Sequence, residues 1–170
     1  RRAAYLLAMA HAAHCDHDHE HDHKPGPTAV AHELAAAEAR CAAAEQKLTA
    51  PRRRVLELLL ETGQPAKAYD LIAAFGADGK PAKPPTVYRA LEFLERQGFA
   101  HRIESLNAYI ACRMGEAGHD AALLICDCCG ATREVDPSAA KGIADAGALA
   151  GYAVSHVTIE AHGKCADCQA

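Results

Sequence analysis

Apolar residues recur at helical spacing through the first half of the chain. An Ala- and Glu-rich stretch predicts a helix over residues 28–47. A second helix is expected after Thr49, because Thr is a favoured N-cap residue and the Pro51 that follows is tolerated in a first helical turn. The same spacing predicts a short helix over 66–75 and a fourth helix over 85–97.

The residues after the fourth helix alternate between apolar and polar side chains, which predicts two short strands over 99–104 and 108–112. Within the helix itself, Val87, Leu91 and Leu94 are spaced to face the interior. The last three of these helices, followed by a two-stranded ribbon, have the order of a winged helix-turn-helix. The last helix of that fold enters a groove of DNA. A small helical module that binds protein would show the same pattern, so periodicity leaves both functions open.

The second half of the chain has the pattern of a small α/β module. Strands are predicted over 120–126, 131–136 and 152–160, and a helix over 137–149 separates the last two. Residues 113–118, a Gly-containing stretch between the two patterns, mark the expected boundary. The sequence therefore predicts an α+β chain of two modules.

Composition limits the protein classes that fit this pattern. The chain has 170 residues, half of them hydrophobic but only 5% aromatic, and no apolar run approaches the ~20 residues that a membrane helix needs. Its formal net charge of −4 argues, taken alone, against a nucleic-acid binder. Residues 47–103, however, carry 10 basic and 6 acidic residues, whereas the segments on either side are acidic on balance. This distribution suggests that only the middle meets a polyanion, although chance variation of the surface would explain it equally well.

Two pairs of cysteines have the spacing of metal ligands. Cys126 and Cys129 form one Cys-x-x-Cys pair, and Cys165 and Cys168 form another. Four thiolates make a closed tetrahedral shell that suits a structural zinc ion, because zinc accepts soft sulfur ligands and has no redox chemistry. Cys128 lies beside Cys129 and could compete for the metal, but the spacing favours Cys129. Metal-ligand spacing, rather than a disulfide framework, also indicates a reducing, cytoplasmic location.

The N-terminal segment has no periodic pattern. Residues 14–23 alternate His with acidic residues beside Cys15, a composition that binds divalent metals weakly and in many arrangements. A solvated tail without a role is an equally good interpretation. The apolar residues behind Arg1 and Arg2 resemble a short signal peptide, which we interpret as the end of a poorly defined extension. We therefore set residues 1–27 apart as a His-rich extension that is expected to be disordered.

Several motifs occur in the order and at the separations of one known family. They are TAPRRRVLELL, AYDLIAAF, KPPTVYRALEFLERQGFAHRIES, YIAC, LLICDCCGATREV and IEAHGKCADC, over about residues 38–170. Together they resemble the ferric uptake regulator (Fur) superfamily and are most similar to its zinc uptake regulators. The resemblance implies a zinc-responsive transcriptional repressor that binds operator DNA as a homodimer and blocks zinc-uptake genes. It implies neither an enzyme nor a small-molecule substrate other than zinc.

The same resemblance gives the two modules their roles. Residues 28–112 correspond to the winged-helix DNA-binding domain, 113–118 to the hinge and 119–170 to the zinc-binding dimerisation domain. The four paired cysteines correspond to the family's structural zinc site. A second, regulatory site brings the expected content to about two zinc ions per chain.

The regulatory site is placed by the resemblance at four positions that match residue for residue: His101, Cys112, His119 and Glu134. These residues come from both modules, so they meet only when the hinge has one angle, and metal binding would select that orientation. Their mixed sulfur, nitrogen and oxygen donors suit zinc but hold it less firmly than four thiolates do. For a third metal site of the superfamily, this chain offers only Asp120 and His156 as weak candidates, and we leave that site unassigned. Cys41 is interpreted as a buried thiol.

Most of the candidates for specific contact with DNA lie on the predicted fourth helix. Arg89 lies one turn into it, where a guanidinium could pair with O6 and N7 of guanine. Thr86 and Tyr88 could donate to phosphates, and Tyr69 resembles a DNA contact of the family. Attraction to the DNA backbone is expected from five basic residues: Arg52, Arg53, Arg54, Lys80 and Lys83. For the three arginines, a solvated helix face is at least as good an interpretation.

Three other functions stay open at this point. Another metal or peroxide sensor of the superfamily would favour nitrogen and oxygen ligands for iron or manganese, which Cys112 argues against. A cytoplasmic zinc carrier, working through the His-rich extension, would bind no operator. An enzyme would need an open metal position or a nucleophile–base pair, and neither is visible in the sequence.

Overall fold

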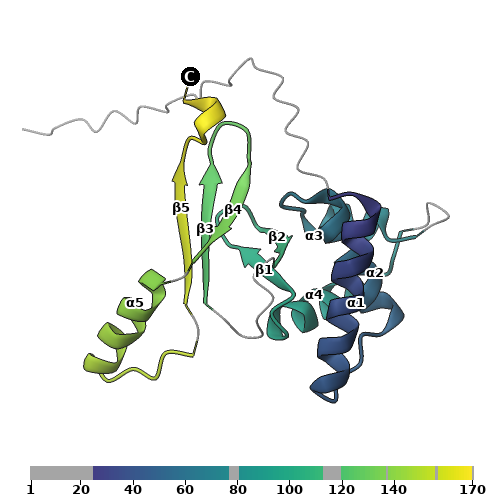
Figure 1. Ribbon diagram of the computed structural model, residues 1–170, viewed down its shortest axis with the longest axis horizontal. Helices are drawn as coiled ribbons and strands as arrows, with labels where there is room; N and C mark the ends of the chain where they lie inside the picture. The colour runs from purple at the N-terminus through teal and green to yellow at the C-terminus, as the bar shows by residue number, and fades with distance from the viewer. Residues whose placement is uncertain (1–24, 77–80, 113–119, 137, 156, 170) are drawn as a thin grey trace, which may run out of the picture.

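The computed structural model describes residues 25–76, 81–112, 120–136, 138–155 and 157–169, with the side chain of Ala139 left aside. The His-rich residues 14–23 and the expected hinge at 113–118 therefore lie outside the described residues. Figure 1 shows the described part as a helical group and a three-stranded sheet, with a two-stranded ribbon between them. None of the described helices has the length and apolar character needed to cross a membrane.

Four helices form the first group: α1 (Pro27–Ala43), α2 (Ala50–Thr62), α3 (Ala68–Ala74) and α4 (Pro84–Arg96). Their apolar faces enclose one core, in which Val55, Leu59 and Val87 are fully buried. Thr49 is the N-cap of α2, as predicted, although its side chain makes no capping hydrogen bond. Gly63 ends this helix with φ 60°, a left-handed conformation that glycine adopts without a steric penalty.

Strands β1 (Ala100–Ile103) and β2 (Ala108–Ala111) pair antiparallel and form the expected wing. Asn107, in the turn between them, has φ 47°, which Asn tolerates better than most residues. The helix expected from residue 66 begins two residues later, at the start of α3. The reason is that Ala66 and Tyr109 exchange two backbone hydrogen bonds of 2.8 Å, which adds a single-residue bridge to the wing.

The second group is a sheet in the order β4–β3–β5, made of β3 (Ala121–Cys126), β4 (Thr132–Val135) and β5 (Thr158–Gly163). β4 pairs antiparallel with β3, and β5 pairs parallel with it on the other side. Helix α5 (Ser138–Leu149) lies between β4 and β5 in the chain and stands beside one end of the sheet in Figure 1. The predicted order of strand, strand, helix and strand is confirmed.

The prediction of a strand over 152–160 is wrong at its start, since β5 begins at Thr158. Alternating apolar side chains at Tyr152 and Val154 support a strand, but both side chains are exposed. The chain folds back on α5 here instead. The Tyr152 N–H donates to the Gly147 carbonyl over 2.9 Å, and a Cβ at Gly147 would lie only 2.5 Å from Val154.

The wing packs against the sheet through an apolar cluster. Ile103 and Ile110 of the wing share this cluster with Leu123 and Ile125 of β3, and all four side chains are buried. Leu106, from the turn of the wing, packs against the same cluster. Hydrophobic burial therefore joins the helical group to the sheet through the wing.

Candidate metal centres

The four cysteines of the two Cys-x-x-Cys pairs come together at one edge of the sheet. Because β3 and β5 run parallel, their carboxyl ends lie at the same edge, and one pair belongs to each end. Cys126 ends β3, Cys129 follows in the next turn, and Cys165 and Cys168 lie at the short 3₁₀ helix η1 (Ala166–Cys168). The four sulfur atoms lie within 4.8 Å of one another, and Cys128 is not part of this group.

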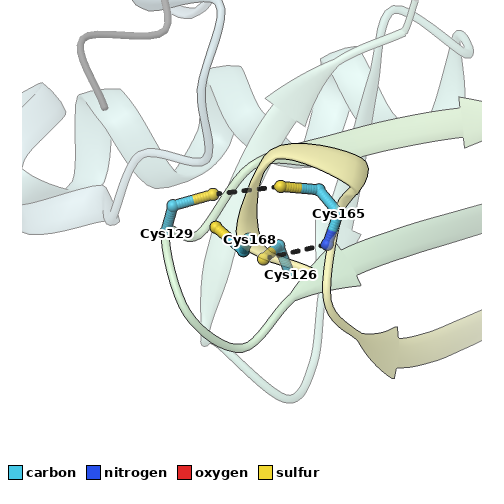
Figure 2. Close-up of side chains that lie close together, drawn as sticks. All are labelled: Cys126, Cys129, Cys165 and Cys168. Atoms are coloured by element: carbon cyan, nitrogen blue, oxygen red, sulfur yellow. Dashed lines mark hydrogen bonds between the residues drawn. The ribbon is translucent and has the colours of Figure 1, made fainter. Parts of the chain in front are cut away.

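Figure 2 shows these four side chains turned toward a common centre, with 3.7 Å between the Sγ atoms of Cys129 and Cys165. Zn–S bonds of about 2.3 Å in a tetrahedron put the sulfur atoms about 3.8 Å apart. The sulfur spacing and the ligand chemistry therefore both fit a zinc ion.

Burial and hydrogen bonding act in opposite directions on these thiols. Burial raises the pKa of Cys126, but backbone N–H groups of Cys129 and Cys165 lower it to about 6 overall. One of these bonds runs from the Cys165 N–H to Cys126 Sγ over 3.3 Å. Burial and the neighbouring thiols raise the pKa of Cys168 to about 12. The thiolate of Cys126 therefore forms readily, whereas Cys168 would need the charge of a metal ion to lose its proton.

A second group of donors lies between the wing and the sheet. It consists of His101 from β1, Cys112 directly after β2 and Glu134 from β4, and its candidate ligand atoms lie within 4.8 Å of one another. His101 Nε2 lies 2.9 Å from Glu134 Oε1, and Cys112 Sγ lies 3.9 Å from the same oxygen. The side chains of His101 and Glu134 are only 10% and 7% exposed. The wing thus supplies two donors and the sheet supplies one.

The environment of His101 favours a cation at this position. Burial lowers its pKa, but hydrogen bonds with Cys112 and Glu134 raise it to about 9 overall. At neutral pH the metal-free imidazole is therefore protonated and forms an ion pair with Glu134. A metal ion bound at this nitrogen would have to replace the proton.

The remaining metal candidates differ in what the structure says of them. His119, the fourth expected member of the second group, lies outside the described residues, and so does His156. Asp120 Oδ1 accepts a hydrogen bond from the Val157 N–H over 2.8 Å, so this carboxylate holds the chain just before β5. Cys41 is buried in α1, where burial raises the pKa of its thiol.

The expected DNA-contacting residues lie on the surface of the helical group. Tyr88 and Arg89 are exposed on α4, and Thr86 is half-buried in its first turn. Tyr69, near the start of α3, is 78% exposed, and Lys83 is exposed just before α4. Exposed hydroxyl, guanidinium and ammonium groups are suited to contact phosphates and base edges.

The arginines at the start of α2 are engaged within the chain. Arg52 stacks on the ring of Phe93, 3.5 Å from its centre. Arg53 pairs with a glutamate of α1 at 2.8 Å, and Arg54 donates to the last carbonyl groups of α3. These side chains therefore support the packing of the helices, a role that the sequence pattern does not indicate. Lys80 lies outside the described residues.

The model of the ferric uptake regulator family matches residues 43–162. The zinc uptake regulation proteins of Escherichia coli (strain K12) and Shigella flexneri are each 44% identical to this chain over 140 residues. The match covers 79% of this chain and 80% of each relative.

Two solved structures are similar in both sequence and fold. One is a zinc uptake regulator complexed with zinc and DNA. It is 42% identical to this chain with a TM-score of 0.74, and the match covers 82% of this chain and 95% of the regulator. The other is holo XcZur, which is 38% identical, with a TM-score of 0.73, over 80% of this chain and 96% of that one.

Proposed function

This chain belongs to the ferric uptake regulator family, and on that premise we propose that it is a zinc-responsive transcriptional repressor. A zinc-loaded dimer binds operator DNA and controls genes of zinc uptake and homeostasis. The observation that supports this most directly is the group of His101, Cys112 and Glu134, because its donors come from both the wing and the sheet.

In this proposal the two donor groups have different tasks. Cys126, Cys129, Cys165 and Cys168 hold a structural zinc ion, since four thiolates leave no open coordination position. His101, Cys112 and Glu134, with His119 as the fourth ligand, form the regulatory site. Each chain then takes about two zinc ions.

The regulatory site works by selecting one arrangement of the molecule. Zinc can shift a conformational equilibrium only by its difference in affinity between two states. The wing, which carries His101 and Cys112, continues from α4, and Glu134 belongs to the sheet. A ligand bound by both parts therefore favours the arrangement in which they meet, and so sets the position of α4.

The donor chemistry distinguishes zinc from the other metals sensed within the superfamily. Iron and manganese favour nitrogen and oxygen ligands, whereas zinc accepts a thiolate in a mixed shell. The Cys112 sulfur lies among the donors of this group. We therefore place the chain with the zinc sensors rather than with the iron or peroxide sensors.

Contact with DNA is assigned to α4 and the start of α3. Arg89 reads base edges, while Thr86, Tyr88 and Tyr69 contact the sugar–phosphate backbone. All four lie on the surface of the helical group, and none of them ligates metal in this proposal. DNA-binding and metal-binding residues are therefore separate sets, and the wing, which carries two of the metal donors, directly follows α4.

The dimer is assigned to the second module, residues 119–170. Its helix α5 stands apart from the sheet in Figure 1, and several large apolar side chains on it and beside it are exposed. They include Leu149 (92% exposed), Tyr152 (73%) and Ile143 (51%). Large apolar side chains left exposed to solvent are suited to a protein interface. A second copy of this chain is the partner that a dimeric repressor needs, and the reduced thiols of the metal groups suit a cytoplasmic location.

The test is an operator search followed by a metal titration. The zinc-loaded protein selects duplexes from random-sequence DNA, and the enriched duplex is used in electrophoretic shifts with zinc added and then chelated. We expect a specific complex that chelation removes and added zinc restores. Iron(II) and manganese should not restore it. Equal binding after chelation would exclude a zinc-responsive repressor. A protein that carries zinc without enriching any DNA sequence would be a zinc carrier instead.

A further inference from the structure

The tip of the wing is held to the sheet at a place separate from both metal groups. Glu160 of β5 accepts two hydrogen bonds from consecutive backbone N–H groups in the wing turn. Oε1 accepts from Glu104 over 2.7 Å, and Oε2 accepts from Ser105 over 3.1 Å. Both carboxylate oxygens of Glu160 thus accept hydrogen bonds from the backbone of the wing turn. We call this contact the tip lock.

The surroundings of Glu160 show that its charged form is the one that fits. Its side chain is only 15% exposed. Burial alone would raise its pKa, but the hydrogen bonds from Ser105 and Glu104 lower it below the ordinary value. A carboxylate that is mostly buried and accepts two N–H groups is a directional connection rather than a solvated surface charge.

His162, two residues further along β5, extends the same contact. Its Nδ1 lies 2.9 Å from Asp127 Oδ1, and its Nε2 lies 3.1 Å from Ser105 Oγ. Asp127 directly follows Cys126, and its own N–H donates to the Gly163 carbonyl over 2.8 Å. Three segments therefore converge on the wing tip: the wing turn, β5 and the turn that follows Cys126.

The wing is consequently attached to the sheet at both ends. Near its base, His101 meets Glu134 of β4, and at its tip Glu104 and Ser105 meet Glu160 of β5. The buried cluster around Ile103 also joins the wing to the sheet. A single attachment would leave the wing free to pivot, whereas two attachments at opposite ends fix its direction.

We propose that Glu160 is a positioning residue that acts through the tip lock to hold the wing in the arrangement that the regulatory metal group selects. The inference rests on the proposed function, because the regulatory group and the operator are part of that proposal. The tip lock and the bound metal stabilise the same arrangement, so each strengthens the other by the same factor. Loss of the lock weakens metal binding at His101, Cys112 and Glu134 although Glu160 touches none of them.

The experiment compares Glu160→Gln with Glu104→Gln in the full chain. Gln is nearly isosteric with Glu but removes the charge and one acceptor oxygen. Glu104 is the matched control: it lies in the same turn, and its carboxylate is 68% exposed and pairs with Arg102. Zinc affinity of the regulatory group is measured without DNA, by competition with a chelator of known affinity. The free zinc needed for half-maximal operator binding is measured in parallel.

We expect Glu160→Gln to weaken regulatory zinc binding about tenfold, within the usual range of coupling between two sites. The free zinc for half-maximal operator binding rises by a similar factor, and excess zinc restores full operator affinity. Glu104→Gln behaves as wild type. Glu160→Asp keeps both acceptor oxygens and recovers part of the loss. Thermal melting and the content of tightly held zinc confirm that the variants are folded.

Two results would overturn the inference. One is unchanged zinc affinity in a folded Glu160→Gln protein. The other is a loss of operator affinity that excess zinc does not recover, which would mean that Glu160 does not act through the metal equilibrium. If wild type itself shows no zinc-dependent operator binding, the proposed function fails. The zinc affinities of the DNA-free variants then still decide whether the tip lock and the metal group are coupled.

Discussion

The two donor groups of this molecule are built in opposite ways. The four thiols come from two short, locally spaced pairs, and both pairs belong to one sheet. The group of His101, Cys112 and Glu134 takes its members from the wing and the sheet, and no local spacing relates them. A ligand bound within one rigid unit contributes to the stability of that unit. A ligand bound between two units contributes to their relative position, so the same metal can do structural work at one group and regulatory work at the other.

The largest expected effect follows from removing a thiol of the first group. Cys126→Ser or Cys168→Ser should unfold the second module or dissociate the dimer, because a structural zinc ion contributes on the order of 10 kcal/mol to a small fold. Circular dichroism, sedimentation and zinc content are the measurements. A folded dimer that retains all of its zinc would remove the distinction between the two groups.

Removing a donor of the second group should leave the fold intact and change only the zinc dependence. This is expected for each of Cys112→Ser, His101→Ala, His119→Ala and Glu134→Ala. Each variant should keep its structural zinc and need at least ~10-fold more free zinc for operator binding, because only the metal-loaded arrangement loses a ligand. Operator titrations at buffered free zinc give the result. Wild-type zinc dependence in any two of these variants would show that the sensor lies elsewhere, and the His-rich residues 14–23 would be examined next.

Arg89→Ala should affect DNA recognition without affecting either metal group. Loss of a bidentate contact to guanine costs roughly 1–3 kcal/mol and is confined to the specific sequence. Binding to unrelated DNA should weaken much less, and zinc content and zinc affinity of the free protein should not change. If affinity falls equally for every sequence and the salt slope shrinks by about one, Arg89 contacts only phosphate.

The smallest effect is expected at Arg53, which serves as the counterpart of Arg89. Its guanidinium pairs with Glu38 at 2.8 Å, and both side chains are about half exposed. An exposed ion pair contributes at most ~1 kcal/mol to stability. Arg53→Ala should therefore lower the melting temperature slightly and leave operator affinity and its salt dependence unchanged. A clear reduction of the salt slope would instead assign this side chain to the phosphate backbone.

The sequence predicted those features that depend on local spacing. The four helices, the wing and the two Cys-x-x-Cys pairs each follow from residues close together in the chain. The prediction that a strand begins at residue 152 was wrong because it relied on local alternation alone. The contacts of Tyr152 and Val154 with Gly147 are not part of that local pattern.

Features that depend on sheet register needed more than the residue pattern. The antiparallel pairing of β3 with β4 and the docking of the wing bring Glu134 to His101, and the parallel pairing of β3 with β5 brings Glu160 to Ser105. The family resemblance indicated the first of these meetings, and nothing in the sequence indicated the second. A lone glutamate in a short strand has the composition of a surface residue, and only the fold makes it a partner of the wing turn.

The parallel pairing of β3 with β5 also orders events during synthesis of the chain. β3 and β4 are made before α5, but β5 follows only after the whole of α5, and Cys165 and Cys168 follow β5. The helices and the wing contact one another over shorter stretches of chain and can fold first, because domains fold as they emerge. A growing chain can therefore complete its helical group before half of the sulfur donors have been made. Completion of the four-thiol group therefore has to wait until β5 and the residues that follow it have been made.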